Sequence, residues 1–275
     1  MMKACVMGWP IAHSLSPVLH GFWLQQHHIA GEYARQAVRQ DELAAALARL
    51  KTGDWCGCNL TIPLKEAAIP LLDRLDDTAA RIGAVNTVVV EKGHLAGLNT
   101  DGFGFIENLR EGAPGFDAKT GPAVVLGAGG AARAIVAALI EAGAREIRLA
   151  NRSLDRARAL ARDLGGAVAP VAWERRETAL DGAALLVNAT NLGMEKNPPL
   201  ALDLARLPKT AVVNDIVYAP LETALLKTAK ARGNGVIDGL GMLLHQGRPG
   251  FERWFGILPE VTPALRQAVL AALRP

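Results

Sequence analysis

A glycine-rich turn in the middle of the chain constrains the fold more than any other feature of the sequence. The valine-rich run Ala123–Leu126 leads into Gly127-Ala128-Gly129-Gly130-Ala131-Ala132, and an alanine-rich helical stretch follows to Ala142. In such a strand–turn–helix context a dinucleotide pyrophosphate binds at the helix N-terminus. Gly127 permits the tight turn, Gly129 lets phosphates approach bare backbone, and Ala132 lets the helix pack on the strand. We therefore expect residues 127–131 to bind a dinucleotide.

The next predicted strand, residues 146–150, ends at Asn151-Arg152-Ser153, with Arg156 and Arg158 close behind. An NAD site usually places Asp or Glu about 20 residues past the glycine turn, where it binds the ribose 2′-hydroxyl. Here a neutral amide and a cation occupy that place. A guanidinium pairs bidentately with a 2′-phosphate that a carboxylate would repel, so the pattern predicts NADP. The alternative is that these arginines form a solvated helix face.

Composition excludes several classes of function. The chain has 275 residues, half of them hydrophobic and 5% aromatic, with a net charge of +3. This length and the Ala, Leu, Val and Gly content predict two α/β domains with parallel strands. The basic residues are scattered, which argues against nucleic acid as a partner.

The three cysteines, Cys5, Cys56 and Cys58, imply no disulfide framework and are expected to be buried thiols in strands. The histidines are dispersed, so no metal site is predicted. We find no signal peptide and no apolar run long enough to span a membrane, and therefore expect a cytoplasmic protein.

Strand and helix patterns alternate along both halves of the chain. In the first half we predict strands over 3–7, 32–37, 55–60 and 85–90, with a hairpin turn near Lys92-Gly93. Helices are predicted over 16–28, after Asp41 with Leu43, Leu47 and Leu50 on one face, after Pro63, and through Leu72 and Leu75. A linker at 112–122 precedes a second run of elements at 124–126, 131–142, 147–150, 154–164, 168–171, 185–189, 211–215 and 221–231. The tail from Leu240 is helical and ends in a helix over 264–273.

This order predicts an α/β substrate domain followed by a Rossmann-like, doubly wound NADP-binding domain. The C-terminal helices should return to the first domain. The expected boundaries are 1–102 with 240–275 for the substrate domain, and 103–239 for the NADP-binding domain.

Short polar segments interrupt the apolar elements of the first half. They are Ser14-Leu15-Ser16-Pro17, Asn59-Leu60-Thr61-Ile62-Pro63-Leu64-Lys65, Ala84-Val85-Asn86-Thr87 and Asn99-Thr100-Asp101-Gly102. Each lies at a predicted strand end or helix start, where ligands bind in open α/β sheets. Their hydroxyl, amide, amino and carboxylate groups suit a small polyhydroxylated molecule. Singly, each has a structural interpretation: Ser16 as a helix N-cap, Asn86 as a backbone partner, Asp101 as a turn residue and Lys65 as a surface residue.

Together, these segments closely resemble the shikimate dehydrogenase family. The matching phrases run through the whole chain in the family's order: residues 8–17, 59–65, 82–87, 97–102, 127–133, 151–153, 188–194, 215–218 and 238–246. The resemblance implies reversible NADP-linked reduction of 3-dehydroshikimate to shikimate, a step of aromatic amino-acid biosynthesis. It implies Lys65 and Asp101 as the catalytic pair. It implies substrate contacts from Ser14, Ser16, Asn59, Thr61, Asn86, Tyr218 and Gln246. On the cofactor side it implies Asp77, Gly127, Ala128, Gly129, Gly130, Ala131, Asn151, Arg152, Ser153, Arg156, Thr190, Ile216 and Gly239.

Two alternatives stay open at this point. Quinate carries one more hydroxyl than shikimate, and two serines offer no methyl group that would exclude it; Arg248-Pro249-Gly250 also departs from the family's alanine-rich pattern. A non-catalytic sensor of NADP or a metabolite is the other alternative, although it would not need both Lys65 and Asp101. Either a monomer or a homodimer is expected.

Overall fold

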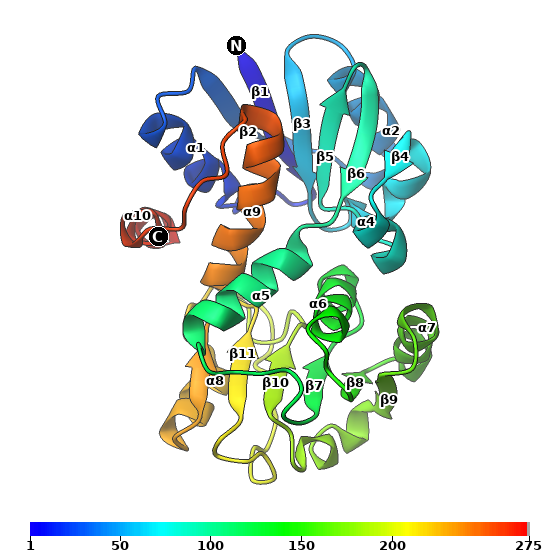
Figure 1. The fold of residues 1–275 in the computed structure, drawn as a ribbon, viewed down its shortest axis with the longest axis vertical. Helices are drawn as coiled ribbons and strands as arrows, with labels where there is room; N and C mark the ends of the chain where they lie inside the picture. Colours follow the sequence, from blue (N-terminus) through cyan, green and yellow to red (C-terminus); the bar gives the residue numbers. More distant parts are fainter. Residues whose placement is uncertain (274–275) are drawn as a thin grey trace. The chain divides into compact units, whose positions relative to one another are not determined.

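The computed structural model describes residues 1–273, which divide into two compact units. One unit comprises Met1–Asp101 and the C-terminal residues from Leu243, and the other comprises Gly102–Met242. The chain therefore passes between the units twice, after Asp101 and after Met242 (Figure 1). None of the helices among the described residues is long and apolar enough to cross a membrane.

A mixed sheet of six strands forms the centre of the first unit. Its order is β2-β1-β3-β5-β6-β4, and the strands are β1 Met2–Gly8, β2 Gly31–Ala37, β3 Trp55–Leu60, β4 Arg74–Leu75, β5 Thr87–Glu91 and β6 His94–Leu98. β1 runs parallel to β2 and β3, whereas β5 is antiparallel to β3 and β6. The carboxyl ends of β1, β3 and β6 therefore lie at the same edge of the sheet as the start of β5. This edge gathers the polar segments of the sequence.

Helices pack on this sheet, and two of them come from the C-terminal tail. They are α1 Ser16–Gln26, α2 Leu43–Leu50, α3 Leu64–Ala67, α4 Asp77–Ile82, α9 Leu240–Phe255 and α10 Pro263–Leu273, with short 3-10 turns η1 Gln40–Glu42 and η2 Ile69–Leu71. α10 packs against α1. This contact confirms that the C-terminal helices return to the first part of the chain.

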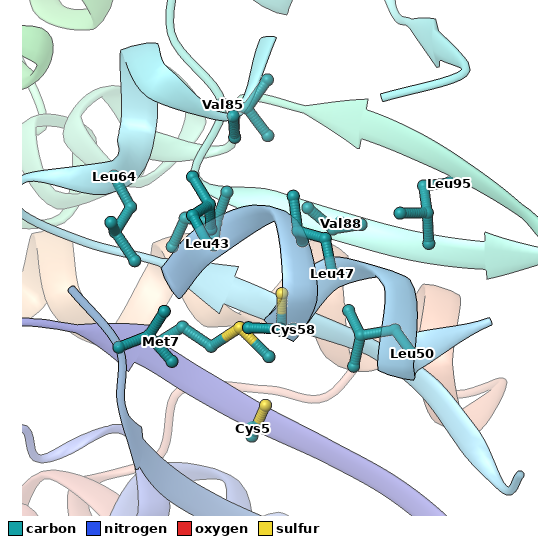
Figure 2. Packing of buried hydrophobic residues seen from close by; sticks show 14 of the residues in the cluster. Cys5, Met7, Leu43, Leu47, Leu50, Cys58, Leu64, Val85, Val88 and Leu95 are labelled. Atoms are coloured by element: carbon teal, nitrogen blue, oxygen red, sulfur yellow. The ribbon is translucent and has the colours of Figure 1, made fainter. Parts of the chain in front are cut away.

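The leucine face predicted for α2 is buried in the core of the first unit. Leu43, Leu47 and Leu50 are each 1% exposed and pack with Cys5 and Cys58 of the central strands (Figure 2). A fully buried leucine contributes roughly 1.5–3 kcal/mol relative to an exposed one. The helical spacing of these leucines therefore both predicts α2 and accounts for its attachment.

A sheet of six parallel strands forms the second unit. In space the order is β12-β11-β10-β7-β8-β9, and the strands are β7 Ala123–Leu126, β8 Ile147–Asn151, β9 Val168–Ala172, β10 Leu185–Asn188, β11 Val212–Asp215 and β12 Gly235–Ile237. Its helices are α5 Asp101–Gly112, α6 Gly130–Glu141, α7 Leu154–Leu164 and α8 Ala224–Ala231, with 3-10 turns η3 Trp173–Arg175 and η4 Thr178–Leu180. Counted along the chain, the strands lie in the order 3-2-1-4-5-6 of dinucleotide-binding sheets, which confirms the doubly wound prediction.

Some predicted elements of the first unit are wrong. The helix expected through Leu72 and Leu75 is absent, because Leu72 is extended and β4 pairs with β6 instead. Asp41 does not cap α2; it lies within η1, and the Glu42 carboxylate accepts the Arg39 N–H at 2.8 Å. α5 and β12 have no counterpart among the predicted elements. All three cysteines are free and lie in strands, but Cys56 is only half-buried.

Candidate active site

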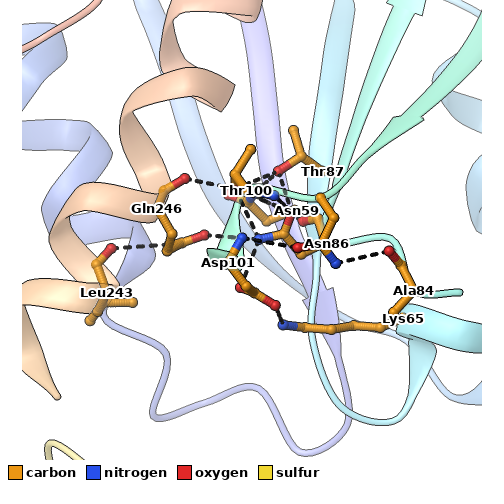
Figure 3. Close-up of polar contacts among 10 residues, drawn as sticks. Asn59, Lys65, Ala84, Asn86, Thr87, Thr100, Asp101, Leu243 and Gln246 are labelled. Atoms are coloured by element: carbon orange, nitrogen blue, oxygen red, sulfur yellow. Dashed lines mark hydrogen bonds and ion pairs between the residues drawn. The ribbon is translucent and has the colours of Figure 1, made fainter. Parts of the chain in front are cut away.

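A lysine–aspartate ion pair lies at the polar edge of the first sheet. Lys65 is on the short helix α3, and Asp101 is the first residue of α5, shortly after the end of β6. Lys65 Nζ lies 2.5 Å from Asp101 Oδ2, and the two side chains are 18% and 8% exposed (Figure 3). An ammonium and a carboxylate this close, and this shielded from water, hold each other in one orientation. The pair can therefore present an acidic N–H group at a fixed point.

Asn86 connects this ion pair to the rest of the site. Its amide nitrogen donates to Asp101 Oδ1 at 2.8 Å and to Thr100 Oγ1 at 2.9 Å, and it lies 3.3 Å from Gln246 Oε1. Its oxygen accepts the Thr100 N–H at 2.8 Å. Asn86 is 2% exposed, so these bonds form away from bulk water. Both carboxylate oxygens of Asp101 thus have a donor, Lys65 on one and Asn86 on the other.

Gln246 reaches the same network from α9. Its backbone carbonyl accepts the Thr100 hydroxyl at 2.8 Å, and its side-chain amide donates to the Leu243 carbonyl at 3.1 Å. Figure 3 shows Gln246 and Lys65 on opposite sides of Asn86 and Asp101. The structure therefore brings together four residues predicted from four separate segments of the sequence: Lys65, Asn86, Asp101 and Gln246.

Asn59 lies behind this group with its amide already engaged. It donates to the Asn86 carbonyl and to Thr87 Oγ1, both at 3.1 Å, and accepts the Tyr33 hydroxyl at 2.5 Å. Burial raises the pKa of Tyr33, so its hydroxyl remains a donor at ordinary pH. Asn59 therefore has a supporting position. Tyr33, Thr87 and Thr100 are absent from the predicted site residues; for Tyr33, a polar tip on an otherwise apolar strand residue is the signal that could have found it.

Ser14 and Ser16 lie next to each other after β1. Ser14 Oγ is 3.3 Å from both the Ser16 hydroxyl and the Ser16 backbone nitrogen. The prediction of Ser16 as an N-cap is wrong: Leu15 holds the N-cap position, its side chain makes no capping hydrogen bond, and Ser16 is the first residue of α1. The Ser14 hydroxyl therefore accepts the N–H of the first residue of α1, whereas the Ser16 hydroxyl has no capping role. Thr61 follows β3, and its methyl group lies against Gly8, where an added Cβ would come within 2.4 Å.

The glycine turn of the second unit has the predicted local geometry. Gly127 has a φ of +108°, and a Cβ there would lie 2.8 Å from the Ala189 carbonyl oxygen at the end of the neighbouring strand. Ala132 is fully buried against the sheet. Gly129 is the N-cap of α6, has no side-chain cap, and faces open space. The α6 N-terminus thus leaves room and free N–H groups for an anion at the point where the strand order reverses.

The arginines expected near the ribose lie at the end of β8. The Ser153 hydroxyl accepts the Arg156 N–H as the N-cap of α7, and the Asn151 amide donates to the Ser153 carbonyl at 2.9 Å. Arg152 and Arg156 are exposed, whereas Arg158 pairs with Asp155. No carboxylate occupies residues 151–153, so this corner is suited to a phosphate.

Of the remaining predicted cofactor residues, Thr190, Ile216 and Gly239 lie in loops after strands of the second unit. Ile216 and Gly239 are in contact, since a Cβ on Gly239 would lie 2.1 Å from the Ile216 carbonyl oxygen. The Thr190 hydroxyl and N–H both donate to Asn188 Oδ1 after β10. Asp77 belongs to the first unit, where it is the exposed first residue of α4.

A buried carboxylate absent from the predicted set supports the segment that carries Ile216 and Tyr218. Asp215 accepts the Thr223 hydroxyl at 2.7 Å, the Asn188 amide at 2.9 Å and the Val217 N–H at 3.1 Å. Burial raises the pKa of Asp215, and also that of Tyr218. Tyr218 lies in the second unit, unlike the other predicted substrate residues. Among residues 1–273, no group of three or more His, Cys, Asp or Glu side chains could hold a metal ion.

Three family profiles match successive parts of the chain. The shikimate dehydrogenase substrate binding domain matches residues 6–88, shikimate / quinate 5-dehydrogenase matches 112–195, and the shikimate 5′-dehydrogenase C-terminal domain matches 239–271.

Individual relatives extend this similarity to nearly the whole chain. The shikimate dehydrogenase (NADP⁺) of Paramagnetospirillum magneticum is 57% identical over 269 residues, 98% of this chain and 98% of that protein. The crystal structure of shikimate 5-dehydrogenase from Thermus thermophilus in complex with NADP(H) and shikimate is 42% identical, with a TM-score of 0.88 over 99% of this chain and 100% of that one. Quinate dehydrogenase from Corynebacterium glutamicum in complex with NAD is 34% identical, with a TM-score of 0.88 over 98% and 99%. The chain belongs to the shikimate dehydrogenase family.

Proposed function

We propose that this protein catalyses the reversible NADP-dependent reduction of 3-dehydroshikimate to shikimate, a step of aromatic amino-acid biosynthesis. The observation that carries the proposal is the shielded Lys65–Asp101 pair, held by Asn86 in a network of hydroxyl and amide groups. It occurs in a chain that also has a dinucleotide-type sheet. The names of relatives that cover nearly the whole chain support the same reaction.

Lys65 is the proposed proton donor and acceptor. When bound, NADP supplies the hydride acceptor or donor for the substrate carbon. As shikimate is oxidised, the C–H bond breaks with its electron pair, and the hydroxyl proton passes to the neutral amine of Lys65. As 3-dehydroshikimate is reduced, the Lys65 ammonium returns that proton to the new alkoxide. Asp101 orients the ammonium through Oδ2 and is itself fixed by Asn86 through Oδ1.

The substrate's other groups have partners of matching chemistry in the first unit. The paired hydroxyls of Ser14 and Ser16, at the start of α1, are proposed to bind the carboxylate, which the helix N-terminus also favours. Thr61, Asn86 and Gln246 are proposed to bind ring hydroxyls, with Asn59 supporting them from behind. Tyr218 is the proposed contact from the second unit. Residues 1–102 and 240–273 would then form the substrate domain, and Arg274 and Pro275, the last two residues of the predicted span, lie outside the described residues.

The residues present in the second unit fit a phosphorylated dinucleotide. The open α6 N-terminus after Gly127 suits the pyrophosphate, and Arg152 with Arg156 suits a 2′-phosphate. The proposed contacts are residues 127–131, 151–153, Arg156, Thr190, Ile216 and Gly239, within a domain of residues 103–239, together with Asp77 of the first unit.

A steady-state comparison of shikimate and quinate, each with NADP⁺ and NAD⁺, tests the proposal. We expect the highest kcat/KM with shikimate and NADP⁺. A higher kcat/KM with quinate would show that the protein is a quinate dehydrogenase instead. Binding of cofactor and shikimate without turnover would instead support a sensor and contradict the proposal.

The proposal also covers the cellular compartment and the oligomeric state of the protein. Three free thiols and no disulfide among the described residues fit a reducing compartment, and we propose a cytoplasmic protein. A monomer or homodimer is proposed, and sedimentation of the purified protein distinguishes the two.

A further inference from the structure

An arginine that is not among the predicted site residues forms hydrogen bonds with the loop that carries Ser14. Arg35, near the end of β2, donates from Nε to the Ser14 carbonyl oxygen at 2.9 Å and from Nη2 to the same oxygen at 2.6 Å. The guanidinium is exposed, and no carboxylate among residues 1–273 forms an ion pair with it. Its positive charge is therefore not neutralised by a neighbouring side chain.

Backbone hydrogen bonds and the burial of Ile11 and Leu15 also hold the loop from Trp9 to Leu15. The Trp9 N–H donates to the Ile62 carbonyl at 3.0 Å, and the Ser14 N–H donates to the Ile11 carbonyl at 3.0 Å. The Arg39 guanidinium lies 4.5 Å from the centre of the Trp9 ring. At the end of the loop that carries Ser14, the two hydrogen bonds from Arg35 are charge-assisted, and such bonds are stronger than those between neutral groups.

The position of the Ser14 backbone sets the separation between the Ser14 and Ser16 hydroxyls. Ser14 Oγ is within 3.3 Å of the Ser16 hydroxyl and backbone nitrogen, so a shift of the Ser14 backbone moves this pair of groups apart. Arg35 thus acts on the hydroxyl pair through one carbonyl oxygen. It also brings a positive charge to the Ser14 carbonyl, and positive charge attracts a carboxylate ligand.

We propose that Arg35 is a positioning residue for the substrate carboxylate, an inference that rests on the proposed function. Arg35 holds Ser14 beside Ser16 and contributes positive potential to the place where these hydroxyls bind an anionic group. It does not touch the reacting carbon, so its effect falls on the affinity for the carboxylate and leaves the proton transfer at Lys65 nearly unchanged.

The test compares Arg35→Ala, Arg35→Gln and Arg35→Lys with the wild-type protein. Arg74→Ala is the matched control, since Arg74 is an exposed arginine of β4, at the opposite edge of the same sheet from β2. The measurements are kcat and KM for shikimate, KM for NADP⁺, and the ratio of kcat/KM between shikimate and its uncharged methyl ester. That ratio reports on the carboxylate, and a merely structural defect would not change it.

We expect Arg35→Ala to raise KM for shikimate about 5- to 30-fold, as for a partly exposed charge-assisted hydrogen bond, and to change kcat and KM for NADP⁺ less than about threefold. The acid-to-ester ratio should fall by a similar factor in Arg35→Ala and Arg35→Gln. Arg35→Lys keeps the charge but loses one of the two hydrogen bonds to the Ser14 carbonyl. Its acid-to-ester ratio should therefore lie between those of these variants and wild type. Arg74→Ala should match wild type.

If Arg35→Ala lowers kcat/KM equally for the acid and the ester, the acid-to-ester ratio is unchanged and the inference is overturned. If Arg35→Ala does not fold, as judged by circular dichroism and thermal unfolding, Arg35→Gln decides by the same criterion. A wild-type protein that does not oxidise shikimate would refute the proposed function itself, whereas an active wild type with unaffected variants refutes only the role of Arg35.

Discussion

Replacing Asp101 by asparagine removes one charge and keeps the shape of the side chain. The Asp101 carboxylate accepts from two donors, Lys65 Nζ at 2.5 Å and Asn86 Nδ2 at 2.8 Å. An asparagine has one acceptor oxygen, so its NH₂ group must face one of these two donors whichever way the amide is turned. The variant therefore loses one hydrogen bond and places two donors against each other.

The expected loss follows from the burial of this pair. Asp101 and Lys65 are 8% and 18% exposed, so water screens their interaction little. A hydrogen bond to a charged group is worth roughly 1.5–3 kcal/mol. If the transition state loses that amount because Lys65 is no longer oriented, kcat falls about 10- to 150-fold, while KM for shikimate changes less.

The assay is NADPH formation at saturating shikimate and NADP⁺, with thermal unfolding of each variant measured in parallel. Asp73→Asn is the control, since Asp73 also pairs with a lysine of the same unit, Lys51, at 2.9 Å, but with side chains 34% and 37% exposed. We expect its kcat to stay within about twofold of wild type. A folded Asp101→Asn protein whose kcat resembles that of Asp73→Asn would refute the reasoning.

Three further predictions concern the cofactor, the core and acid stability. Arg152→Ala should raise KM for NADP⁺ about 10- to 100-fold and leave KM for NAD⁺ nearly unchanged, because only NADP⁺ has the 2′-phosphate. An unchanged preference for NADP⁺ over NAD⁺ would mean that another residue binds the 2′-phosphate. Leu47→Ala should lower the free energy of unfolding by about 2–5 kcal/mol in urea titration, because Leu47 is 1% exposed in the core. Burial lowers the pKa of His20 to about 3, and the neighbouring Asn59 amide opposes this only in part. The unfolded chain therefore binds more protons than the folded one between pH 3 and 6.5, so stability falls as the pH falls through that window. His20→Phe, which keeps a ring against Tyr33, should remove about 2–3 kcal/mol of the stability difference between pH 7 and 4.5, and equal differences in both proteins would contradict this.

Elements specified by local chemistry could be predicted from the sequence. The turn at Gly127 and the leucine face of α2 depend on residues within a few positions of each other, and both are confirmed. β4 could not be predicted in this way, because its two residues become a strand only by pairing with Ala96 and Gly97 of β6. Leucines at 72 and 75 have helical spacing, and the long-range pairing overrides it.

The candidate site shows the same division. The polar segments at strand ends indicate which residues gather, since parallel strands bring their carboxyl ends to one edge. The supporting contacts have no local signal: Tyr33 reaches Asn59 and Arg35 reaches Ser14 across 26 and 21 residues of sequence. These contacts depend on the register of β2 against β1, which only the folded sheet determines.

In the proposed reaction, Lys65, oriented by Asp101, exchanges a proton with the substrate oxygen. The most direct measurement is shikimate-dependent NADPH formation by wild type and by Lys65→Ala under saturating conditions. We expect rapid turnover by the wild type and a kcat about 10²- to 10⁴-fold lower in the variant, with shikimate binding nearly unchanged. A folded Lys65→Ala protein with near-normal kcat would contradict the claim.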